Sequence, residues 1–429
     1  MICTKILIKQ LKEKKMMLNN NCSYPIKLVR QQFPALKRMH NNRLVAYFDG
    51  PGGTQVVSTA INAIAGYMQK GGANLHAQFP SSQETDEHIL EAKKAMADLL
   101  NANYKEIAFG ANSTSLAFSI ARAIGRNWKP GDEIVVTELD HRGNVDPWIA
   151  IAKDKGVTIR WIKVNTDTFT LDLWDLDSII NEKTVLVAVG LASNAVGTIS
   201  EVEKVSARAK KVGALVVIDA VQAVPHIYVD RDYLGADILF CSTYKFFGPH
   251  IGVVAISSEI FEKLETYKLN PAPMNIPDKL ETGTQNHEGI AGIKPAVEFI
   301  AALGEGNTRR QQIISGYEKI EEYENMLANK IRENFSKLSK IRLYHAPENV
   351  RKTPTIAFTV EGMSPRDVCK WVVDKYSIFI ASGDFYASTL ADKLDINKNG
   401  GWVRAGLSPY NSEEEVDNFI EAINVLVGK

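Results

Sequence analysis

The chain has 429 residues, of which 45% are hydrophobic, and its 50 Lys and Arg residues balance 50 Asp and Glu residues, so its formal net charge is zero. This balance favours neither nucleic acid nor an anionic membrane surface as a partner and indicates a protein that works on small molecules. A chain of this length buries a large core and forms two domains, or one large domain with an appendage.

The cysteines and the N-terminus bear on the compartment. The four cysteines are Cys3, Cys22, Cys241 and Cys369. They lack the spacing of a metal site, and the last two have apolar neighbours among which a reduced cysteine is a small hydrophobic residue. Residues 1–21 lack the apolar core of a signal peptide, and no later stretch is long enough to span a membrane. We expect a cytoplasmic protein without a metal; Met16 or Met17 as the true start and an organelle-targeting N-terminus stay open.

Residues 44–54, Leu-Val-Ala-Tyr-Phe-Asp-Gly-Pro-Gly-Gly-Thr, predict a short strand that ends in a glycine-rich turn. Such a turn lets the backbone approach another group closely, although an ordinary loop has the same composition. Further on, Ser81 and Glu84 have the spacing of a capping box, and the apolar positions that follow recur every three or four residues. They predict a scaffold helix whose buried face consists of Ile89, Ala92, Met96 and Leu99.

From residue 106 onward, short apolar runs alternate with amphipathic helical segments. The seven runs are residues 107–109, 134–137, 157–164, 185–191, 215–218, 238–241 and 253–256. Because the runs are apolar on both faces and helical segments separate them, they predict an α/β fold, a mostly parallel seven-stranded sheet sandwiched by helices.

The part of the chain after residue 257 indicates a second, smaller domain. A helical pattern covers residues 310–338, a strand-like run covers 355–360, and a final helix is predicted over 412–427. We therefore predict three parts. They are an N-terminal extension and arm at residues 1–40, a large domain at 41–300 and a small α+β C-terminal domain at 301–429.

Polar residues follow the predicted strands, at the edge where open parallel sheets bind ligands. Asn112, Ser113 and Thr114 lie between the first strand and a helix, so they offer hydroxyls, backbone N–H groups and a positive helix end to an anion such as phosphate. The same residue types also serve as ordinary helix caps. His141, after the second strand, either stacks on a planar ligand or is a hydrogen-bonded loop histidine.

Asp219 comes directly after the fifth run, and Lys245 follows the sixth. A carboxylate at a strand end is partly shielded from water and needs a cationic or donor partner to stay charged. Aromatic neighbours favour a neutral, nucleophilic Lys245, although a loop lysine that packs its stem on aromatic rings gives the same pattern. An acid and a lysine on successive strand ends suit pyridoxal phosphate, because the lysine binds this cofactor as an imine and the acid keeps the pyridine nitrogen protonated.

Six segments of the chain resemble, in order, those of a known family. The segments are Asp140-His141, Ser193-Asn194-Ala-Val-Gly-Thr198, Asp219-Ala-Val-Gln-Ala-Val-Pro-His226, Ser242-Thr-Tyr-Lys-Phe-Phe-Gly-Pro249, Gly283-Thr284 and Arg404-Ala-Gly-Leu-Ser-Pro-Tyr-Asn411. From Tyr47 to the C-terminus the chain resembles class V aminotransferase-fold enzymes, and particularly their cysteine desulfurase-like branch. This resemblance implies a fold-type I pyridoxal phosphate-dependent transferase whose large domain binds the cofactor.

For the ring of the cofactor, pyridoxal 5'-phosphate, the resemblance implies four residues. Lys245 is the Schiff-base lysine and a catalytic residue. Asp219 is the partner of the pyridine nitrogen, and Gln222 donates to the phenolic oxygen. His141 stacks on the ring and takes part in catalysis.

For the cofactor's phosphate, the resemblance implies donors from two places in the chain. Ser242 and the turn of Asn112, Ser113 and Thr114 hold the phosphate within one subunit. Thr284 reaches the phosphate of the neighbouring subunit, which implies a homodimer with shared active sites.

For the amino-acid substrate, the resemblance implies that Arg404 grips the α-carboxylate with its planar fork and that Asn194 assists from the sheet side. His76, in the segment Gly-Gly-Ala-Asn-Leu-His, matches a substrate-side segment less closely. Without the resemblance, Arg404 lies in a predicted short strand where an ordinary salt bridge explains it equally well.

The chain departs from the desulfurase pattern at one loop. Cysteine desulfurases carry a nucleophilic cysteine on a mobile loop before the carboxylate arginine. Here residues 381–394, Ala-Ser-Gly-Asp-Phe-Tyr-Ala-Ser-Thr-Leu-Ala-Asp-Lys-Leu, contain Asp384 and Tyr386 but no cysteine. Cys369 lies earlier, on a predicted helix over residues 365–375 whose apolar spacing favours a packed position.

We therefore expect a pyridoxal phosphate-dependent lyase or transferase that cleaves the C–S bond of cysteine or a cysteine-like amino acid. Cleavage by β elimination needs no protein thiol and begins with the same proton abstraction, by Lys245, as transamination and epimerisation. An aminotransferase or an amino-acid epimerase of the class V family is the alternative. A cofactor-binding sulfur-relay partner without turnover is the non-enzyme alternative, which the presence of both Lys245 and Arg404 disfavours.

Overall fold

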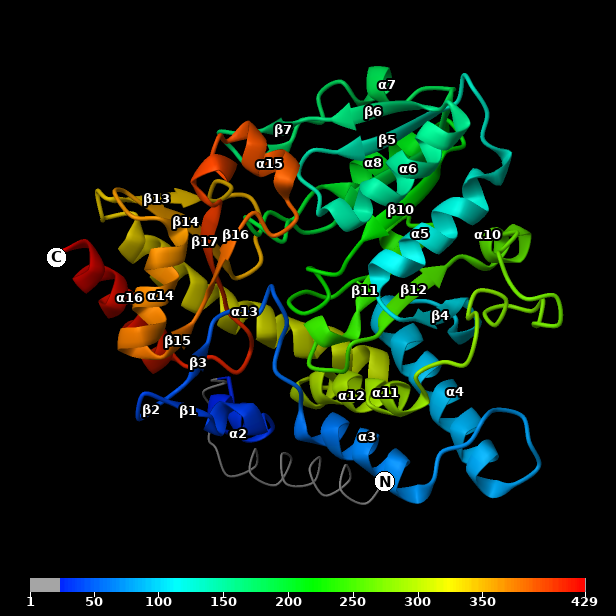
Figure 1. The fold of residues 1–429 in the computed structure, drawn as a ribbon, viewed down its shortest axis with the longest axis horizontal. Coiled ribbons are helices and arrows are strands. Elements are labelled where there is room, and N and C mark those ends of the chain that lie inside the picture. Colours follow the sequence, from blue (N-terminus) through cyan, green and yellow to red (C-terminus); the bar gives the residue numbers. More distant parts are fainter. Residues whose placement is uncertain (1–23, 429) are drawn as a thin grey trace.

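The structure is a computed structural model that describes residues 24–428. The possible start residues Met16 and Met17, the basic N-terminal segment, Cys3 and Cys22 lie outside the described residues. Figure 1 shows a large and a small β-sheet side by side, with helices around both. Within the described part, no helix combines the length and the apolar composition that crossing a bilayer requires.

The large sheet has seven strands in the order β4-β12-β11-β10-β9-β5-β6. Neighbouring strands from β11 to β6 are parallel, whereas β12 runs antiparallel to both β11 and β4. The predicted seven-stranded, mostly parallel sheet is thus confirmed. Its strands are β4 (Ile107–Gly110), β5 (Glu133–Thr137), β6 (Thr158–Ile162), β9 (Thr184–Gly190), β10 (Leu215–Asp219), β11 (Ile238–Ser242) and β12 (Gly252–Ile256).

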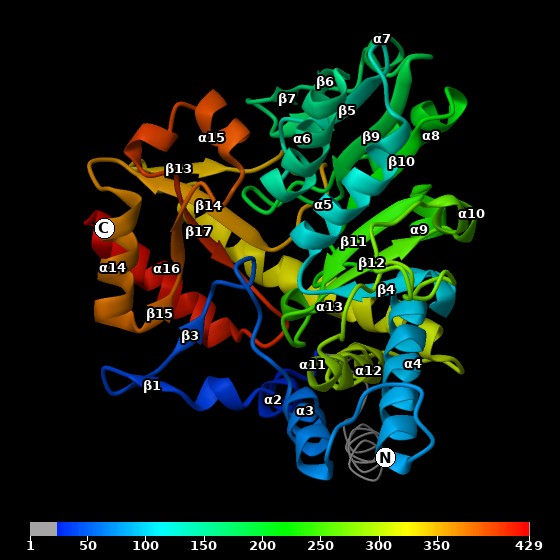
Figure 2. The ribbon, with the colours of Figure 1, turned by 45° about the vertical axis from the view of Figure 1, so that its right-hand side comes forward.

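Successive side chains of the large sheet point to opposite faces, so each face has its own core. In β10, Val216 and Ile218 pack into one core, whereas Val217 between them packs into the other. Figure 2 shows helices on both faces, which is why apolar residues occupy both sides of these strands. The helices of the first core include α3 (Ser58–Lys70), α4 (Pro80–Leu100), α8 (Val202–Lys211), α11 (His287–Ala291) and α12 (Ile293–Leu303), and those of the second are α5 (Ser113–Ile124), α6 (Asp146–Lys155) and α10 (Ser258–Lys263).

Helix α4 has the predicted buried face, but the predicted capping box at its start is wrong. The helix begins at Pro80 and follows Phe79, which makes no side-chain cap, so Ser81 already lies inside the first turn. Proline suits the first helical position because it has no N–H group to satisfy and its φ is preset. The next serine, Ser82, instead holds the preceding loop by donating to the carbonyl of Asn74 at 2.6 Å and accepting from the N–H of Ala77 at 2.9 Å.

The small sheet has the order β13-β14-β17-β16 and follows the large one in the chain. Its strands are β13 (Ile341–Tyr344), β14 (Thr355–Val360), β16 (Ala381–Gly383) and β17 (Trp402–Gly406), and its helices are α14 (Pro365–Tyr376) and α16 (Glu413–Val427). An N-terminal strand, β3 (Ala46–Tyr47), pairs with β15 (Ile378–Phe379) on this side of the molecule. The predicted domain boundaries at residues 41 and 301 stay a prediction.

Helix α13 (Arg309–Phe335) runs from one sheet to the other. Its first half contributes Ile313 and Ile320 to a core of the large sheet, and its second half contributes Leu327 and Ile331 to the core of the small sheet. The short elements that complete the fold are α2 (Ile26–Gln31), β1 (Met39–His40), β2 (Arg43–Leu44), β7 (Val164–Asn165), β8 (Thr170–Leu171), α7 (Leu176–Ile179), α9 (Arg231–Leu234) and α15 (Ser388–Lys393).

Candidate active site

A cavity of about 340 Å³ lies at the carboxyl ends of the parallel strands. It is lined by the ends of strands β9 to β11, by the turn at residues 51–52 and by Arg404 of the small sheet. The fold brings together ten of the twelve predicted site residues as lining of this cavity: Asn112, Ser113, Thr114, His141, Asn194, Asp219, Gln222, Ser242, Lys245 and Arg404.

Lys245 ends a short turn (Thr243–Lys245) that directly follows β11, and its side chain is buried. The ammonium group donates a hydrogen bond to the carbonyl of Pro51 and lies 4.9 Å from the centre of the Tyr244 ring. Burial and then the charge of Arg404 lower the pKa of Lys245 to about 7. A lysine with this pKa is neutral in a substantial fraction of molecules at neutral pH, and the neutral amine is the form that attacks a carbonyl or accepts a proton.

The carbonyl that Lys245 contacts belongs to the glycine-rich turn, so this turn makes the predicted close backbone approach. Thr54, at its end, donates its N–H to the carbonyl of Tyr244 at 3.1 Å. A Cβ atom on Gly52 would lie 2.4 Å from a carboxylate oxygen of Asp49, so any other residue there would have to displace this carboxylate.

Asp219 is the last residue of β10. Among the described residues, the N–H of Val221 is the one hydrogen-bond donor to its carboxylate, at 2.9 Å. Burial raises the pKa of Asp219 to about 6. Nearby, both polar atoms of the Gln222 amide and the hydroxyl of Ser242 are buried without a partner in the described part of the chain. These groups can serve a ligand that brings a positive nitrogen and further polar atoms.

The segment before α5 caps this helix and also lines the cavity, and its phosphate-binding role stays a prediction. The Asn112 side chain caps the helix by accepting from the N–H of Ser115 at 2.8 Å, so capping explains this side chain. Ser113 and Thr114 form the first turn, where helix N–H groups have no intrahelical acceptor and the helix dipole is positive. Both line the cavity, as a phosphate site requires.

His141 is held as a neutral ring. Its Nδ1 accepts a hydrogen bond from the N–H of Gly143 at 2.9 Å, so the proton lies on Nε2. Burial, followed by the charges of Lys245 and Arg404, lowers the pKa of His141 to about 4. A neutral imidazole at the cavity wall is suited to stacking on a planar ring.

Asp140 lines the cavity too, although we assigned it no role from the sequence. Its carboxyl group accepts from the hydroxyl of Thr137 at 2.6 Å and from the amide of Asn144 at 2.8 Å, and burial raises its pKa to about 7. A Cβ atom at Gly190 would lie 2.9 Å from this carboxyl group, so glycine makes room for it. The sequence did offer a signal for Asp140, because this acid directly precedes His141 after the end of β5.

Arg404, in β17, is almost fully buried, and burial lowers its pKa to about 10, which leaves it charged at neutral pH. Its Nη1 donates to the carbonyl of Asn194 at 2.9 Å and its Nη2 to Asp49 at 3.3 Å, while its Nε has no partner in the described chain. The ring of Phe385 covers the guanidinium at 3.6 Å. Sequence reasoning missed Asp49 and Phe385.

Two predicted site residues lie elsewhere in the subunit. His76 is exposed and pairs with Asp86 at 3.1 Å, and Thr284 lies in an exposed segment. Neither lines the cavity of its own chain. Their roles stay predictions.

The cavity fits pyridoxal phosphate because several of its buried polar atoms have no hydrogen-bond partner in the described chain and could bind the cofactor. Among the described residues, five of the twelve buried side-chain polar atoms without a partner belong to the cavity: Asn194 Oδ1, Gln222 Oε1, Gln222 Nε2, Ser242 Oγ and Arg404 Nε. Lys245 suits the aldehyde, Asp219 the pyridine nitrogen and the start of α5 the phosphate. Arg404 lies on the side of the small sheet, where a carboxylate of the substrate would bind.

Comparisons with known proteins agree with this fit. The family model described as aminotransferase class-V matches residues 46–419. An aminotransferase-like protein of Gibberella zeae is 31% identical over 95% of this chain and 100% of its own length, and a probable cysteine desulfurase of Pyrococcus abyssi is 33% identical over 89% and 94%. The apo structure of a cysteine desulfurase from Thermococcus onnurineus superposes with a TM-score of 0.83 at 31% identity, covering 95% of this chain and 99% of that one.

The match extends over most of the chain, includes both sheets and leaves the cavity inside the matched region. Members of this family use pyridoxal 5'-phosphate. Lys245, Asp219 and the start of α5 are all present at the cavity. The chain therefore belongs to the aminotransferase class-V family and is a cysteine desulfurase-like enzyme that depends on pyridoxal 5'-phosphate.

Proposed function

We propose that this enzyme cleaves the C–S bond of cysteine or a cysteine-like amino acid by β elimination. With water, the substrate gives a thiol or hydrogen sulfide, pyruvate and ammonium, so the reaction needs no oxidant or reductant. The observation that carries this proposal is a cavity with an amine and a carboxylate-binding arginine but no thiol among its lining residues. Relatives named as cysteine desulfurases support the choice of a sulfur amino acid.

The residues of this chain divide the work. Bound pyridoxal phosphate supplies an electron sink for the α carbon of the substrate. Arg404 binds the substrate carboxylate through Nε, which has no partner among the described residues, and through Nη2. Lys245, with a pKa lowered to about 7 by burial and by Arg404, accepts the proton from the α carbon.

The two described cysteines are poor persulfide carriers. Cys241 lies in β11 and packs into a core of the large sheet. Burial raises the pKa of its thiol well above the ordinary value. Cys369 lies on α14, where burial raises its pKa to about 11. Because the thiolate is the nucleophile, neither thiol is ready to attack a substrate sulfur at neutral pH.

An aminotransferase or an epimerase is the second candidate, because both reactions start from the same proton abstraction. The similarity to an aminotransferase-like protein over 95% of this chain favours the aminotransferase. We also propose a homodimer in which Thr284, exposed in its own subunit, faces the phosphate site of the other.

Product analysis tests the proposal. Purified enzyme with cysteine or S-methylcysteine should release the thiol compound and pyruvate in equal amounts. Alanine together with protein-bound sulfur would show a desulfurase, a keto acid with the sulfur retained would show an aminotransferase, and racemised substrate would show an epimerase. Cys369→Ala should keep full activity, and its inactivity in a folded protein would contradict the proposal.

A further inference from the structure

The loop at residues 384–387, Asp-Phe-Tyr-Ala, is called the aromatic loop below. Its residues Phe385 and Tyr386 line the cavity, and both have a left-handed backbone, with φ of 53° and 58°. Two consecutive large residues in this conformation cost free energy because their Cβ atoms crowd the backbone. The surroundings must therefore hold the loop in place.

Hydrogen bonds from the large sheet and within the loop hold the aromatic loop. The side chain of Asn194 donates to the carbonyl of Phe385 at 2.8 Å, and the N–H of Arg142 donates to the carbonyl of Tyr386 at 2.8 Å. Within the loop, the Asp384 carboxylate accepts from the N–H of Tyr386 at 3.1 Å. Asn194 and Arg142 follow strands of the large sheet, so a loop of the small sheet is fixed against the opposite wall of the cavity.

This placement puts the Phe385 ring on Arg404. The centre of the ring lies 3.6 Å from the guanidinium carbon, a close cation–π contact that covers one face of the group. Two edges of the fork donate to Asn194 and to Asp49, and Nε is buried without a partner in the described chain. The edge formed by Nε and the second N–H of Nη2 is therefore the part of the fork that remains for a ligand.

We infer that Phe385 is the positioning and specificity residue of this site. By covering the guanidinium of Arg404, it makes the arginine meet a substrate carboxylate edge-on, through Nε and Nη2, and it keeps water away from this ion pair. An ion pair between guanidinium and carboxylate is stronger where water is excluded. This inference rests on the proposed carboxylate-binding role of Arg404.

The aromatic loop also selects the side chain of the substrate. Phe385 and Tyr386 present apolar ring surface, and the carboxylate of Asp384 adds negative charge close enough to act on His141. An acidic side chain would lose its hydration and meet repulsion here. A thiol or a thioether packs favourably against aromatic rings. The aromatic loop therefore favours α-amino acids with an uncharged side chain, and a sulfur-bearing side chain fits this requirement.

Two amine-free probes of similar length test this with the cofactor-loaded enzyme: 3-mercaptopropionate and succinate. Neither has an amino group, so neither is turned over, and calorimetry gives dissociation constants that do not depend on activity. Wild-type enzyme should bind 3-mercaptopropionate more tightly than succinate. In Phe385→Ala, the dissociation constant for 3-mercaptopropionate should rise about tenfold, depend more steeply on KCl, and differ less from that for succinate.

Further variants separate the ring from the backbone. Phe385→Gly removes the ring at a φ that glycine adopts without strain, so it should match Phe385→Ala, whereas Phe385→Leu keeps apolar cover and should retain more affinity. Tyr386→Ala removes the neighbouring ring, which lies beside His141, and leaves Arg404 covered, so it should weaken binding less than Phe385→Ala does.

The outcomes are distinguishable. If folded Phe385→Ala and Phe385→Gly bind both probes like wild type, or if Tyr386→Ala loses as much affinity, the inference is overturned. If Arg404→Ala binds 3-mercaptopropionate as wild type does, the failure lies instead in the proposed role of Arg404.

Discussion

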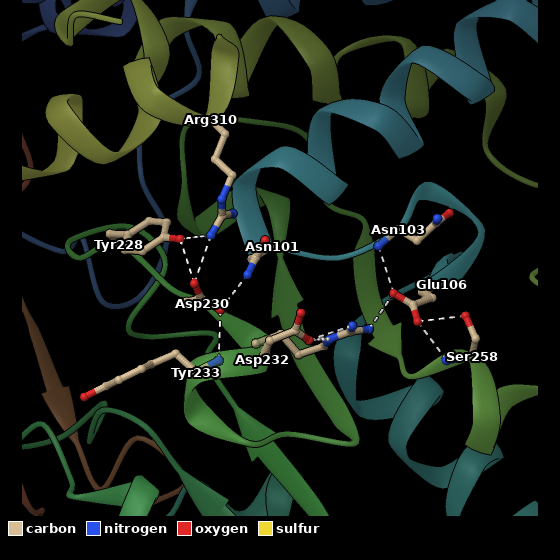
Figure 3. A network of polar contacts seen from close by, with 10 residues as sticks. Asn101, Asn103, Glu106, Tyr228, Asp230, Asp232, Tyr233, Ser258 and Arg310 are labelled. Atoms are coloured by element: carbon tan, nitrogen blue, oxygen red, sulfur yellow. Dashed lines mark hydrogen bonds and ion pairs between the residues drawn. The ribbon is translucent and has the colours of Figure 1, made fainter.

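Two polar regions of the molecule treat buried acids in opposite ways. In the network of Figure 3, the Glu106 carboxylate accepts hydrogen bonds from the N–H of Asn103, from the N–H and hydroxyl of Ser258, and from Arg231. Burial by itself raises the pKa of Glu106, but these donors and the charge of Arg231 hold the pKa below its ordinary value. The fold uses every one of these polar groups.

In the cavity, by contrast, the buried carboxyl group of Asp219 has few hydrogen-bond donors around it. Burial raises its pKa to about 6, and neighbouring groups on Gln222 and Ser242 are buried without partners in the described chain. Buried polar groups normally find partners within the protein, so several groups that lack partners around one cavity indicate a place for a ligand. Changes in the network should therefore cost stability, and changes in the cavity should cost function.

The largest effect is expected at Lys245. Lys245→Ala should lower the turnover of a sulfur amino acid by at least about a thousandfold, because it removes the base and the covalent anchor. Its thermal midpoint without cofactor should not fall, since the change removes a buried amine. Turnover assays and calorimetry on the same sample check this; turnover within tenfold of wild type would contradict the assignment.

On the network side, Glu106→Gln should lower the free energy of unfolding by about 2 to 3 kcal/mol, because it removes the buried carboxylate partner of Arg231 and replaces one acceptor oxygen with an NH2 group. Arg231 then keeps only the exposed Asp232 as a charged partner. Urea unfolding measures this loss. Turnover of the folded variant should match wild type. A variant that kept its stability but lost its activity would reverse the comparison.

A smaller effect, in the cofactor-free protein, concerns pH. The folded pKa of Asp219 is raised from 3.8 to about 6, so the stability that it contributes is complete below pH 3.8 and is lost as pH rises through about 6. Asp219→Asn should therefore reduce the drop in unfolding free energy between pH 5 and pH 8 by on the order of 1 kcal/mol. Denaturation of both proteins at the two pH values gives the difference, and parallel pH curves would refute it.

The smallest effect is expected outside both regions. Glu259 and Lys263 form an exposed pair at 2.8 Å on α10. Since solvent screens such pairs, Glu259→Gln should leave both the thermal midpoint and the turnover unchanged. A clear change in the thermal midpoint or in the turnover would contradict this expectation. It would mean that removing a charge has large effects outside the two buried regions as well.

The strand ends explain how much of the site the sequence predicts. Parallel strands bring residues such as Asp219 and Lys245 to one edge, so the order of elements along the chain already places them together. Asp49 contacts Arg404 across 355 positions in the chain, and Pro51 contacts Lys245 across 194. No local pattern encodes contacts at these separations.

Backbone conformation was the other source of surprise. The left-handed pair Phe385 and Tyr386 has no glycine or asparagine to announce it, because contacts from the large sheet impose it. At α4, serine and glutamate spacing suggested a cap at Ser81, but Pro80 had already started the helix. In both places the local structure depends on a residue outside the sequence pattern: a contact from the large sheet at Phe385, and Pro80 at the start of α4.

Helix α13 has a consequence for how the molecule melts. Its 27 residues, about 40 Å of helix, place Ile313 in a core of the large sheet and Phe335 in the core of the small sheet. Unfolding either core strips half of this helix of its packing, and an isolated half-helix is only marginally stable in water. The two sheets are thereby coupled into one cooperative unit, and calorimetry should record a single transition.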